Sequence, residues 1–363
     1  MRAQNTGVIL LSGQPSALRR CGAGCTNWSC RPVIIDVMFA RAATALLLIT
    51  LLLFGVVETA NAKEFGSLCQ DQPAFCQQLP YPVYFWNSRH NAPHAVVVLI
   101  HGFAMHGRTF ETLANYLAER GFASVAIDMQ GYGERRTDLN SGVSRREAID
   151  YKRSLSDYQL LIKRVHESYP SLAVFVVGES LGASMAIRVA ATSPEIAGIV
   201  LSSPALRLRK SVSVENLPCV LAHVAIPSRS VNLSRCIRKL VADQSEIQDE
   251  VAADRLIRRR FGTRDIYRTL SFMHRTIRFC RSVPTSVPCC MLESSDDTLL
   301  SGCGAYKILK ALGSTEKNFR MFNEKAHILL ETNCVRPDVL DAVYRWIDER
   351  VEHTKVGQSF HNG

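Results

Sequence analysis

The sequence is poor in charged residues, and it has neither repeats nor low-complexity segments. Only 21% of its 363 residues are charged, whereas 47% are hydrophobic. A chain with this balance buries a large core and is not intrinsically disordered. No period of roughly 20–50 residues recurs, which argues against a solenoid, and no window is rich in Gly and Ser or in Gln and Asn. The length fits one large domain that carries an insertion.

Positive charge is concentrated in one segment of the chain. The net charge is +10, and residues 205–281 hold 16 Lys and Arg residues against 7 Asp and Glu residues. The remainder of the chain is therefore close to neutral, and the basic character belongs to a local surface. Because no nucleic-acid recognition motif accompanies this charge, we expect no nucleic-acid partner.

An uncharged stretch near the amino terminus is typical of a secretory signal peptide. Residues 42–57 carry no charge, Arg41 precedes them, and Ala60 and Ala62 occupy the −3 and −1 positions of a cleavage site. The sequence thus predicts a signal peptide over 38–62 and an exported protein, periplasmic or secreted. The stretch is short for a membrane span of about 20 residues, and a retained single-pass membrane anchor is the alternative.

Residues 1–37 precede Met38, where the signal-peptide pattern begins. We interpret 1–37 as an upstream extension that is not translated if synthesis starts at Met38. Three cysteines in this segment lack the fourth ligand that a zinc site needs.

Nine cysteines remain beyond residue 62, and export would place them in an oxidising compartment. The expected disulfide pairs are Cys69–Cys76 and, as a weaker prediction, Cys219–Cys236. Because nine is an odd number, at least one cysteine stays free or pairs between chains. We interpret Cys289 and Cys290, in an apolar run, as small buried hydrophobic residues.

Beyond residue 95, apolar runs typical of buried strands alternate with amphipathic helical segments. Strands are expected over 95–100, 123–128, 172–177, 198–201, 288–292 and 318–322. Helices are expected over 109–120, 145–168, 180–191, 304–312 and 337–351. The alternation predicts an α/β fold with a mostly parallel central sheet and helices on both faces.

The basic segment interrupts this alternation. Residues 205–281 contain no buried-strand run and are mostly helical in pattern. We therefore expect a basic helical lid over 205–281, inserted into a core formed by 63–204 and 282–355, with a tail over 356–363.

A Gly-x-Ser-x-Gly motif follows the third expected strand. Gly178, Ser180 and Gly182 lie between that strand and a helix, the context in which this motif marks a nucleophilic serine. The sharp turn strains the serine, and only glycine tolerates the close approach of backbone on either side. The bland alternative is a serine in an ordinary turn.

Two backbone amides are candidates for an oxyanion hole. His101-Gly102-Phe103 follows the first expected strand, and Leu181 follows the candidate nucleophile. We expect the Phe103 and Leu181 N–H groups to face a reacting carbonyl oxygen. His101 precedes the nucleophile in the chain, so we expect it to brace the loop rather than act as the base.

A serine nucleophile needs a base and an acid that orients the base. The chain order serine, acid, histidine points to His327 after the last expected strand, and to Asp296 or Asp297 after the strand before it. Asp297 is preferred because Leu299 can anchor its turn, and Asp296 is the alternative. Two later histidines, His353 and His361, lie at the end of a helix and in the tail.

These motifs together resemble the α/β-hydrolases of the monoacylglycerol lipase and lysophospholipase group, which share a profile with the serine aminopeptidases. The likeness covers about residues 82–350. The motifs that carry it are HGF at 101–103, DMQGYGER at 128–135, GESLG at 178–182, LSSPAL at 201–206, SSDDTLLSGCGAY at 294–306 and EKAHILLE at 324–331.

The resemblance implies a catalytic triad of Ser180, Asp297 and His327, and it requires no metal and no organic cofactor. The spacing from the acid to the helix that starts at 304–306 matches the family and supports Asp297. Two positions depart from the family pattern. Glu293-Ser294-Ser295 stands where a glycine usually precedes the acid, and Ile328 stands where an acidic residue usually follows the histidine.

The expected activity is hydrolysis of a carboxylic ester such as a monoacylglycerol or a lysophospholipid, with a small-molecule acyl ester or lipid as the partner. One alternative is an aminopeptidase, which would need lid carboxylates for the substrate ammonium, whereas this lid is basic. The other is a non-catalytic binding protein on the same scaffold.

The lid also allows a prediction about membranes. If 251–261 is helical, its apolar residues lie on one side and its arginines on the other. The apolar residues are Val251, Leu256, Ile257 and Phe261. The arginines of the segment and its surroundings are Arg255, Arg258, Arg259, Arg260, Arg264 and Arg268. Such a surface can contact anionic lipid headgroups or receive the phosphate of a lysophospholipid, and the remaining alternative is a solvated face.

Overall fold

The computed structural model describes residues 8–10, 72–136, 149–209, 230–234, 237 and 244–359. The expected signal peptide over 38–62 lies outside these residues. Each expected disulfide pair has a member outside them as well, so both pairings stay predictions. Within the described part of the chain, no helix is both long enough and apolar enough to cross a membrane.

A single eight-stranded sheet forms the centre of the protein, in the order β1-β10-β9-β6-β5-β3-β4-β2. Its six central strands are β10 (Lys317–Phe322), β9 (Cys289–Ser294), β6 (Ile196–Ser202), β5 (Ala173–Glu179), β3 (Ala95–Ile100) and β4 (Ala123–Ile127). All six are mutually parallel. The expected mostly parallel α/β fold is therefore confirmed.

Both edges of the sheet are antiparallel. At one edge β2 (Val83–Trp86) pairs with β4. At the other edge β1 (Val8–Leu10), from the segment interpreted as an upstream extension, pairs with β10. The sequence pattern did not predict either edge strand, because each is short and lies outside the strand–helix alternation.

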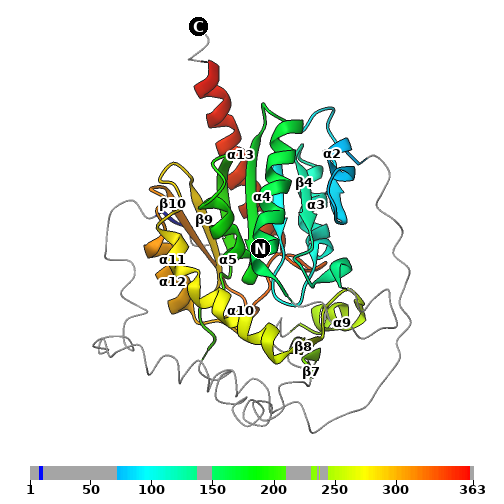
Figure 1. Ribbon diagram of the computed structural model, residues 1–363. Coiled ribbons are helices and arrows are strands. Elements are labelled where there is room, and N and C mark those ends of the chain that lie inside the picture. The colour runs from blue at the N-terminus through cyan, green and yellow to red at the C-terminus, as the bar shows by residue number, and fades with distance from the viewer. Residues whose placement is uncertain are drawn as a thin grey trace.

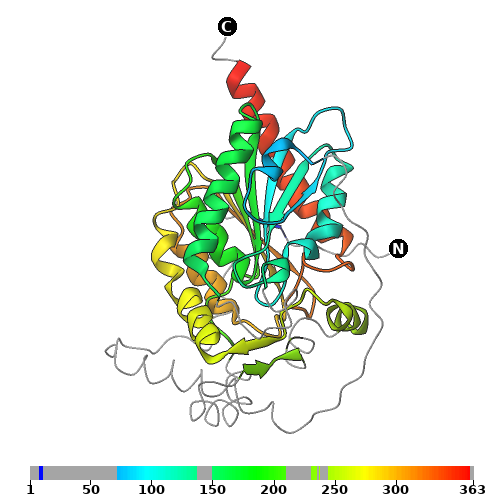
Figure 2. The same ribbon diagram turned by 45° about the vertical axis from the view of Figure 1, so that its right-hand side comes forward.

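Helices cover both faces of the sheet (Figures 1 and 2). One face carries α3 (Glu111–Ala118) and α13 (Pro337–Ser359), and the other carries α4 (Tyr151–Ser168), α5 (Leu181–Ala190) and α12 (Gly302–Ala311). The short α2 (Ala74–Gln77) packs on α4. Helix α13 extends eight residues past the expected end at 351.

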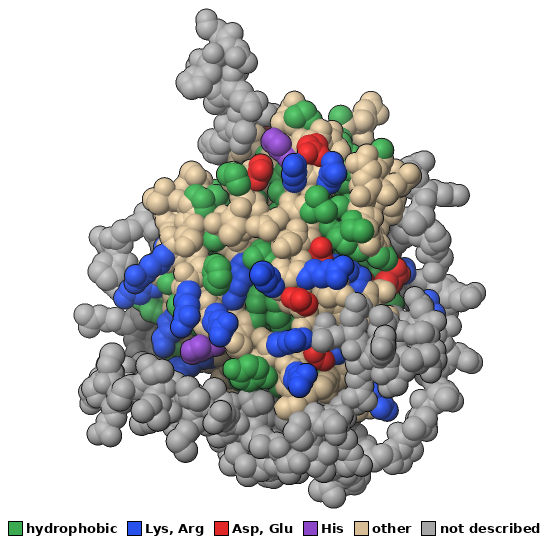
Figure 3. All heavy atoms as spheres, in the orientation of Figure 1, with side chains coloured by type: hydrophobic (Ala, Val, Ile, Leu, Met, Phe, Trp, Pro, Cys, Tyr) green, Lys and Arg blue, Asp and Glu red, His purple; other side chains and the backbone are tan. Residues whose placement is uncertain are grey.

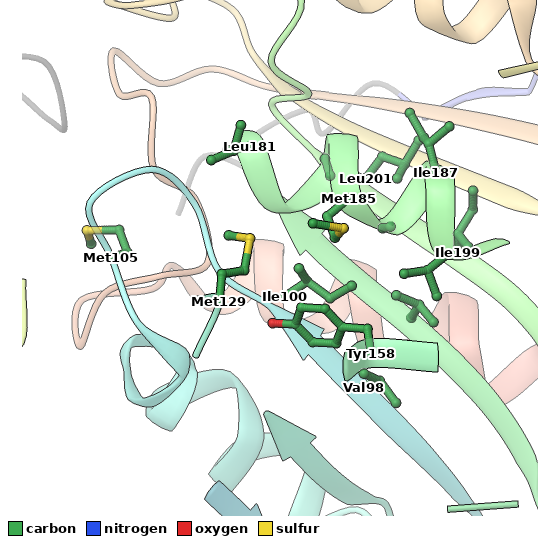
Figure 4. Close-up of a cluster of buried hydrophobic side chains, with 14 of the residues drawn as sticks. Val98, Ile100, Met105, Met129, Tyr158, Leu181, Met185, Ile187, Ile199 and Leu201 are labelled. Carbon is green, nitrogen blue, oxygen red and sulfur yellow. The ribbon is translucent and has the colours of Figure 1, made fainter. Parts of the chain in front are cut away.

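The two helical layers explain why the strand runs are apolar throughout. In β3 every residue is buried: Val97 and Leu99 pack in the layer of α3 and α13, and Val98 and Ile100 pack in the opposite layer. Figure 4 shows Ile100 in that opposite layer, close to side chains of α5 and β6. Cys289 and Cys290 are fully buried in β9, as expected of small hydrophobic residues.

The inserted segment, residues 205–281, adds no strand to the main sheet among its described residues. Between β6 and β9 the chain forms β7 (Ser230–Asn232), α9 (Ser245–Ala253), β8 (Arg260–Gly262), α10 (Thr263–Arg275) and α11 (Ile277–Cys280). Strands β7 and β8 pair with each other in a small separate sheet. In Figures 1 and 2, β7, α9, β8 and α10 lie at one end of the main sheet, whereas α11 lies beside α12 and α5.

The condition that 251–261 forms one helix is not met. Helix α9 ends at Ala253, and the chain then passes through an irregular stretch into β8. The helix stops because the Asp254 carboxylate accepts the Leu256 amide at 2.7 Å, and the Arg258 amide donates to the Ala104 carbonyl at 2.8 Å. These bonds use amides that a helix would direct to its own carbonyls. The four apolar residues grouped by the helical pattern, Val251, Leu256, Ile257 and Phe261, are all buried.

Candidate active site

Ser180 stands on a strained turn between β5 and α5. Its backbone lies in the left-handed region, with φ of 54° and ψ of −113°, and its amide donates to the Ser202 carbonyl at 2.8 Å. A Cβ at Gly182 would collide with the Ile100 carbonyl, and one at Gly178 would collide with the Gly182 backbone. Gly182 is therefore required for the turn to lie against β3, and Gly178 is required for the turn to fold back on its own strand.

Three side chains from separate strand ends meet at this turn. The Ser180 hydroxyl lies 2.8 Å from Nε2 of His327, and Nδ1 of the same ring lies 2.8 Å from Oδ2 of Asp297. The other carboxylate oxygen of Asp297 accepts the amides of Leu299 and Leu300, each at 2.7 Å. The structure thus brings together the serine, histidine and aspartate that the sequence singled out.

The electrostatics of this chain of contacts favour a proton acceptor at Nε2. Burial lowers the pKa of His327, but the charge and the hydrogen bond of Asp297, with the charge of Glu179, outweigh it, so the pKa is raised. Burial raises the pKa of Asp297, but His327 and the two amides outweigh it, so the pKa is lowered. A proton on Nδ1, facing the carboxylate, leaves Nε2 free to accept from the serine.

The neighbouring Asp296 points elsewhere. Its carboxylate pairs with Arg209 at 2.8 Å, and its side chain is half-exposed, whereas Asp297 is buried. The geometry therefore supports Asp297 over the alternative that the sequence left open. His361 lies outside the described residues.

The loop that follows β3 passes directly beside Ser180. A Cβ placed on Gly102 would lie 3.4 Å from the Ser180 Cβ, so this loop passes close to the serine one residue before Phe103. Leu181 is the first residue of α5, and amides in the first turn of a helix have no partner within it.

His101 braces the loop that follows β3. Its Nε2 accepts the Met129 amide at 2.9 Å, and its Nδ1 donates to the Gly102 carbonyl at 2.9 Å. Burial lowers the pKa of His101 to about 4, which keeps the ring neutral. Its hydrogen bonds therefore join this loop to the end of β4, in agreement with the bracing role expected from the sequence.

The inserted segment holds this loop from the outside. The Arg258 amide bonds to the Ala104 carbonyl, and the Asp254 carboxylate lies 2.7 Å from Nε2 of His106. The ring of Phe261 stacks on that of Phe103, with centroids 4.4 Å apart. Residues 254–261 of the insertion therefore lie at the same end of the sheet as Ser180.

Two buried carboxylates at the site were not predicted from the sequence. Glu179 precedes the serine and Glu331 follows His327 by four residues, and both are buried. A signal was present, because each acid stands in an otherwise apolar neighbourhood. Among the described residues, no group of three or more His, Cys, Asp or Glu side chains is arranged to hold a metal ion.

Comparison with known proteins gives consistent results. The family model for serine aminopeptidase, S33, matches residues 91–333, which is more than half of the chain. Monoglyceride lipase of Homo sapiens is 26% identical over 272 residues, which cover 71% of this chain and 84% of that protein. Phospholipase YtpA of Bacillus subtilis is 26% identical over 273 residues, which cover 73% of this chain and 100% of that protein.

The fold has solved counterparts. A soluble variant of monoglyceride lipase from Saccharomyces cerevisiae, in complex with a substrate analogue, matches with a TM-score of 0.64 and 18% identity over 74% of this chain and 90% of that chain. This likeness concerns the fold, and the family model concerns the sequence. Taken with the strand order and the serine turn, they lead to one conclusion: the chain belongs to the serine aminopeptidase, S33 family and is an α/β-hydrolase similar to the monoglyceride lipases.

Proposed function

We propose that this protein is a serine hydrolase that cleaves carboxylic esters of long or medium acyl chains through an acyl-enzyme. One observation carries the proposal: Ser180, His327 and Asp297 form an unbroken chain of 2.8 Å contacts on a strained strand-to-helix turn. A serine hydroxyl becomes a useful nucleophile when a base is within hydrogen-bond reach and a third group orients that base.

The reaction proceeds in two halves. Ser180 Oγ attacks the acyl carbonyl carbon while His327 Nε2 takes its proton, and the Phe103 and Leu181 amides receive the developing oxyanion. The imidazolium, stabilised by Asp297, gives the proton to the departing alcohol as the ester C–O bond breaks. Water then attacks the acyl-enzyme by the same route, which releases the fatty acid and restores Ser180.

The proposed substrates are monoacylglycerols and lysophospholipids. The names of the relatives, monoglyceride lipase and phospholipase, support this class. An amino-terminal peptide substrate would need free carboxylates near the site for its ammonium group. Three acids of the inserted segment that approach the core are engaged already: Asp254 with His106, Asp265 with Arg258, and Glu250 with the Asn333 amide.

Ester turnover tests the proposal. Purified protein should hydrolyse p-nitrophenyl acyl esters and monoacylglycerols, and Ser180→Ala should lose at least about 10³-fold in kcat. A fluorophosphonate probe should label the wild type and not the variant. Equal turnover by the two proteins would refute the assignment. Faster cleavage of aminoacyl-naphthylamides than of esters would favour the peptidase, and a failure to label would favour a binding protein.

We further propose that the inserted segment is a lid whose outer face contacts anionic lipid. The exposed arginines of this face lie on α10 and α11 and just after them: Arg264, Arg268, Arg275, Arg278 and Arg281. They recur at helical spacing, and Tyr267 among them is 61% exposed. Figure 3 shows Lys and Arg side chains gathered over this part of the surface. Basic residues around an exposed aromatic ring favour an interfacial position.

Vesicle binding tests the lipid contact. The wild type should co-sediment with phosphatidylglycerol vesicles more than with phosphatidylcholine vesicles, and Arg264→Gln/Arg275→Gln/Arg278→Gln should lose the difference. Equal sedimentation of wild type and variant with the anionic vesicles would refute it. We also propose export after removal of 38–62, and the amino-terminal sequence of the exported protein tests that directly.

A further inference from the structure

Two buried carboxyl groups lie where the three loops of the candidate site meet. The loops carry Ser180, His327 and Phe103, whose amide is the proposed oxyanion donor. Glu179 is 0% exposed and Glu331 is 1% exposed. Neither forms an ion pair with a described Lys or Arg. A pair of buried acids with no countercharge is costly unless hydrogen bonds and shared protons compensate for it.

Glu179 joins the serine loop to the histidine loop. Its carboxylate accepts the amides of Leu329 at 2.8 Å, Leu330 at 3.0 Å and Glu331 at 2.8 Å, all within four residues of His327. It also accepts the hydroxyl of Ser202 at 2.6 Å. All four partners donate, which is the arrangement that an ionised carboxylate requires.

Glu331 joins the histidine loop to the oxyanion loop. The Gly102 amide, one residue before Phe103, donates to Oε2 at 2.8 Å and lies 3.0 Å from Oε1. Oε1 also lies 2.9 Å from the hydroxyl of Thr109. The last contact decides where the proton is.

The hydroxyl of Thr109 has two oxygen neighbours and one hydrogen. It lies 2.6 Å from the His106 carbonyl, which can only accept, and 2.9 Å from Glu331 Oε1. If the hydroxyl donates to the carbonyl at the shorter distance, the second contact needs a proton from Glu331. Oε2, which carries no proton in this arrangement, is the oxygen nearer to the Gly102 amide.

We propose that Glu179 and Glu331 are positioning residues that lock the serine, histidine and oxyanion loops together, with Glu179 ionised and Glu331 protonated. The inference rests on the proposed serine hydrolase function and adds to it two residues that touch no reacting atom. The pair therefore carries one negative charge, which lies on Glu179, the acid whose charge acts on His327.

Burial, followed by the charge of Glu179, raises the pKa of Glu331 well above its usual range. Burial leaves the pKa of Glu179 raised as well, although hydrogen bonds from the Ser202 hydroxyl and from three backbone amides oppose this effect and favour the ionised form. The charged groups that influence His327 are Asp297 and Glu179, and both raise the pKa of that histidine. Glu324 is a more distant acid whose own pKa is raised by burial and, in part, by Glu179. The charge on Glu179 therefore supports the protonated state of His327 during catalysis.

Matched amide substitutions separate the two acids. In Glu331→Gln the amide can donate to Thr109 and accept from Gly102, so kcat should fall by only about threefold, whereas Glu331→Leu should fall about 100-fold. In Glu179→Gln an amide NH₂ faces backbone N–H donors, so kcat should fall about 100-fold or more with KM changed less than about threefold. Glu119→Gln, at the exposed end of α3, is the control for the chemical change.

The pH profile distinguishes positioning from general damage. Loss of the Glu179 charge should move the acid limb of kcat/KM to lower pH, because one of the two charges that raise the pKa of His327 is removed. Glu331→Gln should leave that limb in place. The opposite assignment, with Glu331→Gln shifting the limb and Glu179→Gln leaving it, would overturn the proposal.

Infrared spectra of the proteins test the proton location without any activity. The carboxylic C=O band of a protonated buried acid should lose intensity in Glu331→Gln and keep it in Glu179→Gln. The first comparison suffices if Glu179→Gln does not fold. An unchanged band in Glu331→Gln would overturn the assignment. If the wild type hydrolyses no ester, the proposed function fails, whereas the band still reports where the proton lies.

Discussion

Sequence patterns predicted which residues meet at the serine site better than they predicted the backbone of the inserted segment. At the site, Ser180, Asp297 and His327 were singled out by their place after strands, and all three meet there. In the insertion, the helical pattern over 251–261 grouped four apolar residues that are all buried, but the backbone of this stretch is not one helix. Strand ends are fixed by ladders of hydrogen bonds, whereas a short helix yields to tertiary contacts.

Arg258 is a residue whose burial the helical pattern did not predict. It was expected among solvent-facing arginines, and it is 5% exposed. Its guanidinium pairs with Asp265 at 2.6 Å and donates to the Gly131 carbonyl at 2.7 Å. An arginine therefore serves here as an internal link between insertion and core, and its neighbours Arg255 and Arg260 are exposed as expected.

The largest expected effect tests the strand-end side of this comparison. Asp297→Asn should lower kcat by about 10³–10⁴-fold, because the imidazole loses the charge that orients it and stabilises its protonated form. Asp296→Asn, one residue away, should stay within about threefold, since its carboxylate pairs with Arg209 instead. Steady-state ester kinetics measure both. Similar losses in the two variants would contradict the inference that Asp297, and not Asp296, orients His327.

Within the insertion, a buried and an exposed arginine should behave differently. Arg258→Leu leaves Asp265 buried without its partner, which typically costs about 3–5 kcal/mol in the free energy of unfolding. Arg264→Gln changes an exposed side chain, and such substitutions stay within about 0.5 kcal/mol. Urea unfolding of the two variants measures the difference. An Arg258→Leu protein as stable as wild type would mean that the insertion is not anchored through this residue.

The pH dependence of catalysis follows from the protonation of His327. Catalysis needs neutral His327, whose pKa is raised by Asp297, so kcat/KM should fall as pH decreases through a midpoint above 6.5. Asp297→Asn should move that midpoint down. The same raised pKa makes the pairing stabilise the fold at lower pH, with that stability lost as pH rises through the folded-state value. An unchanged midpoint in Asp297→Asn would contradict the inferred coupling between Asp297 and His327.

The smallest expected effect is at Gly302, outside the site, and Gly182 within the site provides the contrast. A Cβ on Gly302, at the start of α12, meets no atom within 4 Å, so Gly302→Ala should raise the free energy of unfolding by at most about 1 kcal/mol. Gly182→Ala would instead collide with the β3 backbone and should prevent the serine turn from forming. Thermal unfolding and fluorophosphonate labelling measure the pair. Labelling of Gly182→Ala at the wild-type rate would contradict the steric argument.

Much of the fold could be predicted from the sequence because it depends on interactions between residues that are close together in the chain. Apolar runs such as 95–100 and 173–179 are buried on both faces wherever such a sheet forms, and each was expected within two residues of its bounds. The edge strands β1 and β2 were not expected. They are short, and only their partners in the sheet identify them.

By itself, the sequence determined the alternation of strands and helices, the Gly-Ser-Gly turn and the order of serine, acid and histidine. Sterics and burial act over a few residues, so they can be read along the chain. Only the tertiary structure placed Asp297, and not Asp296, beside His327, ended α9 at Ala253 and paired Glu331 with Gly102. The last two partners are 229 positions apart. Which loops meet is set by the packing of the whole sheet, and no local pattern carries that information.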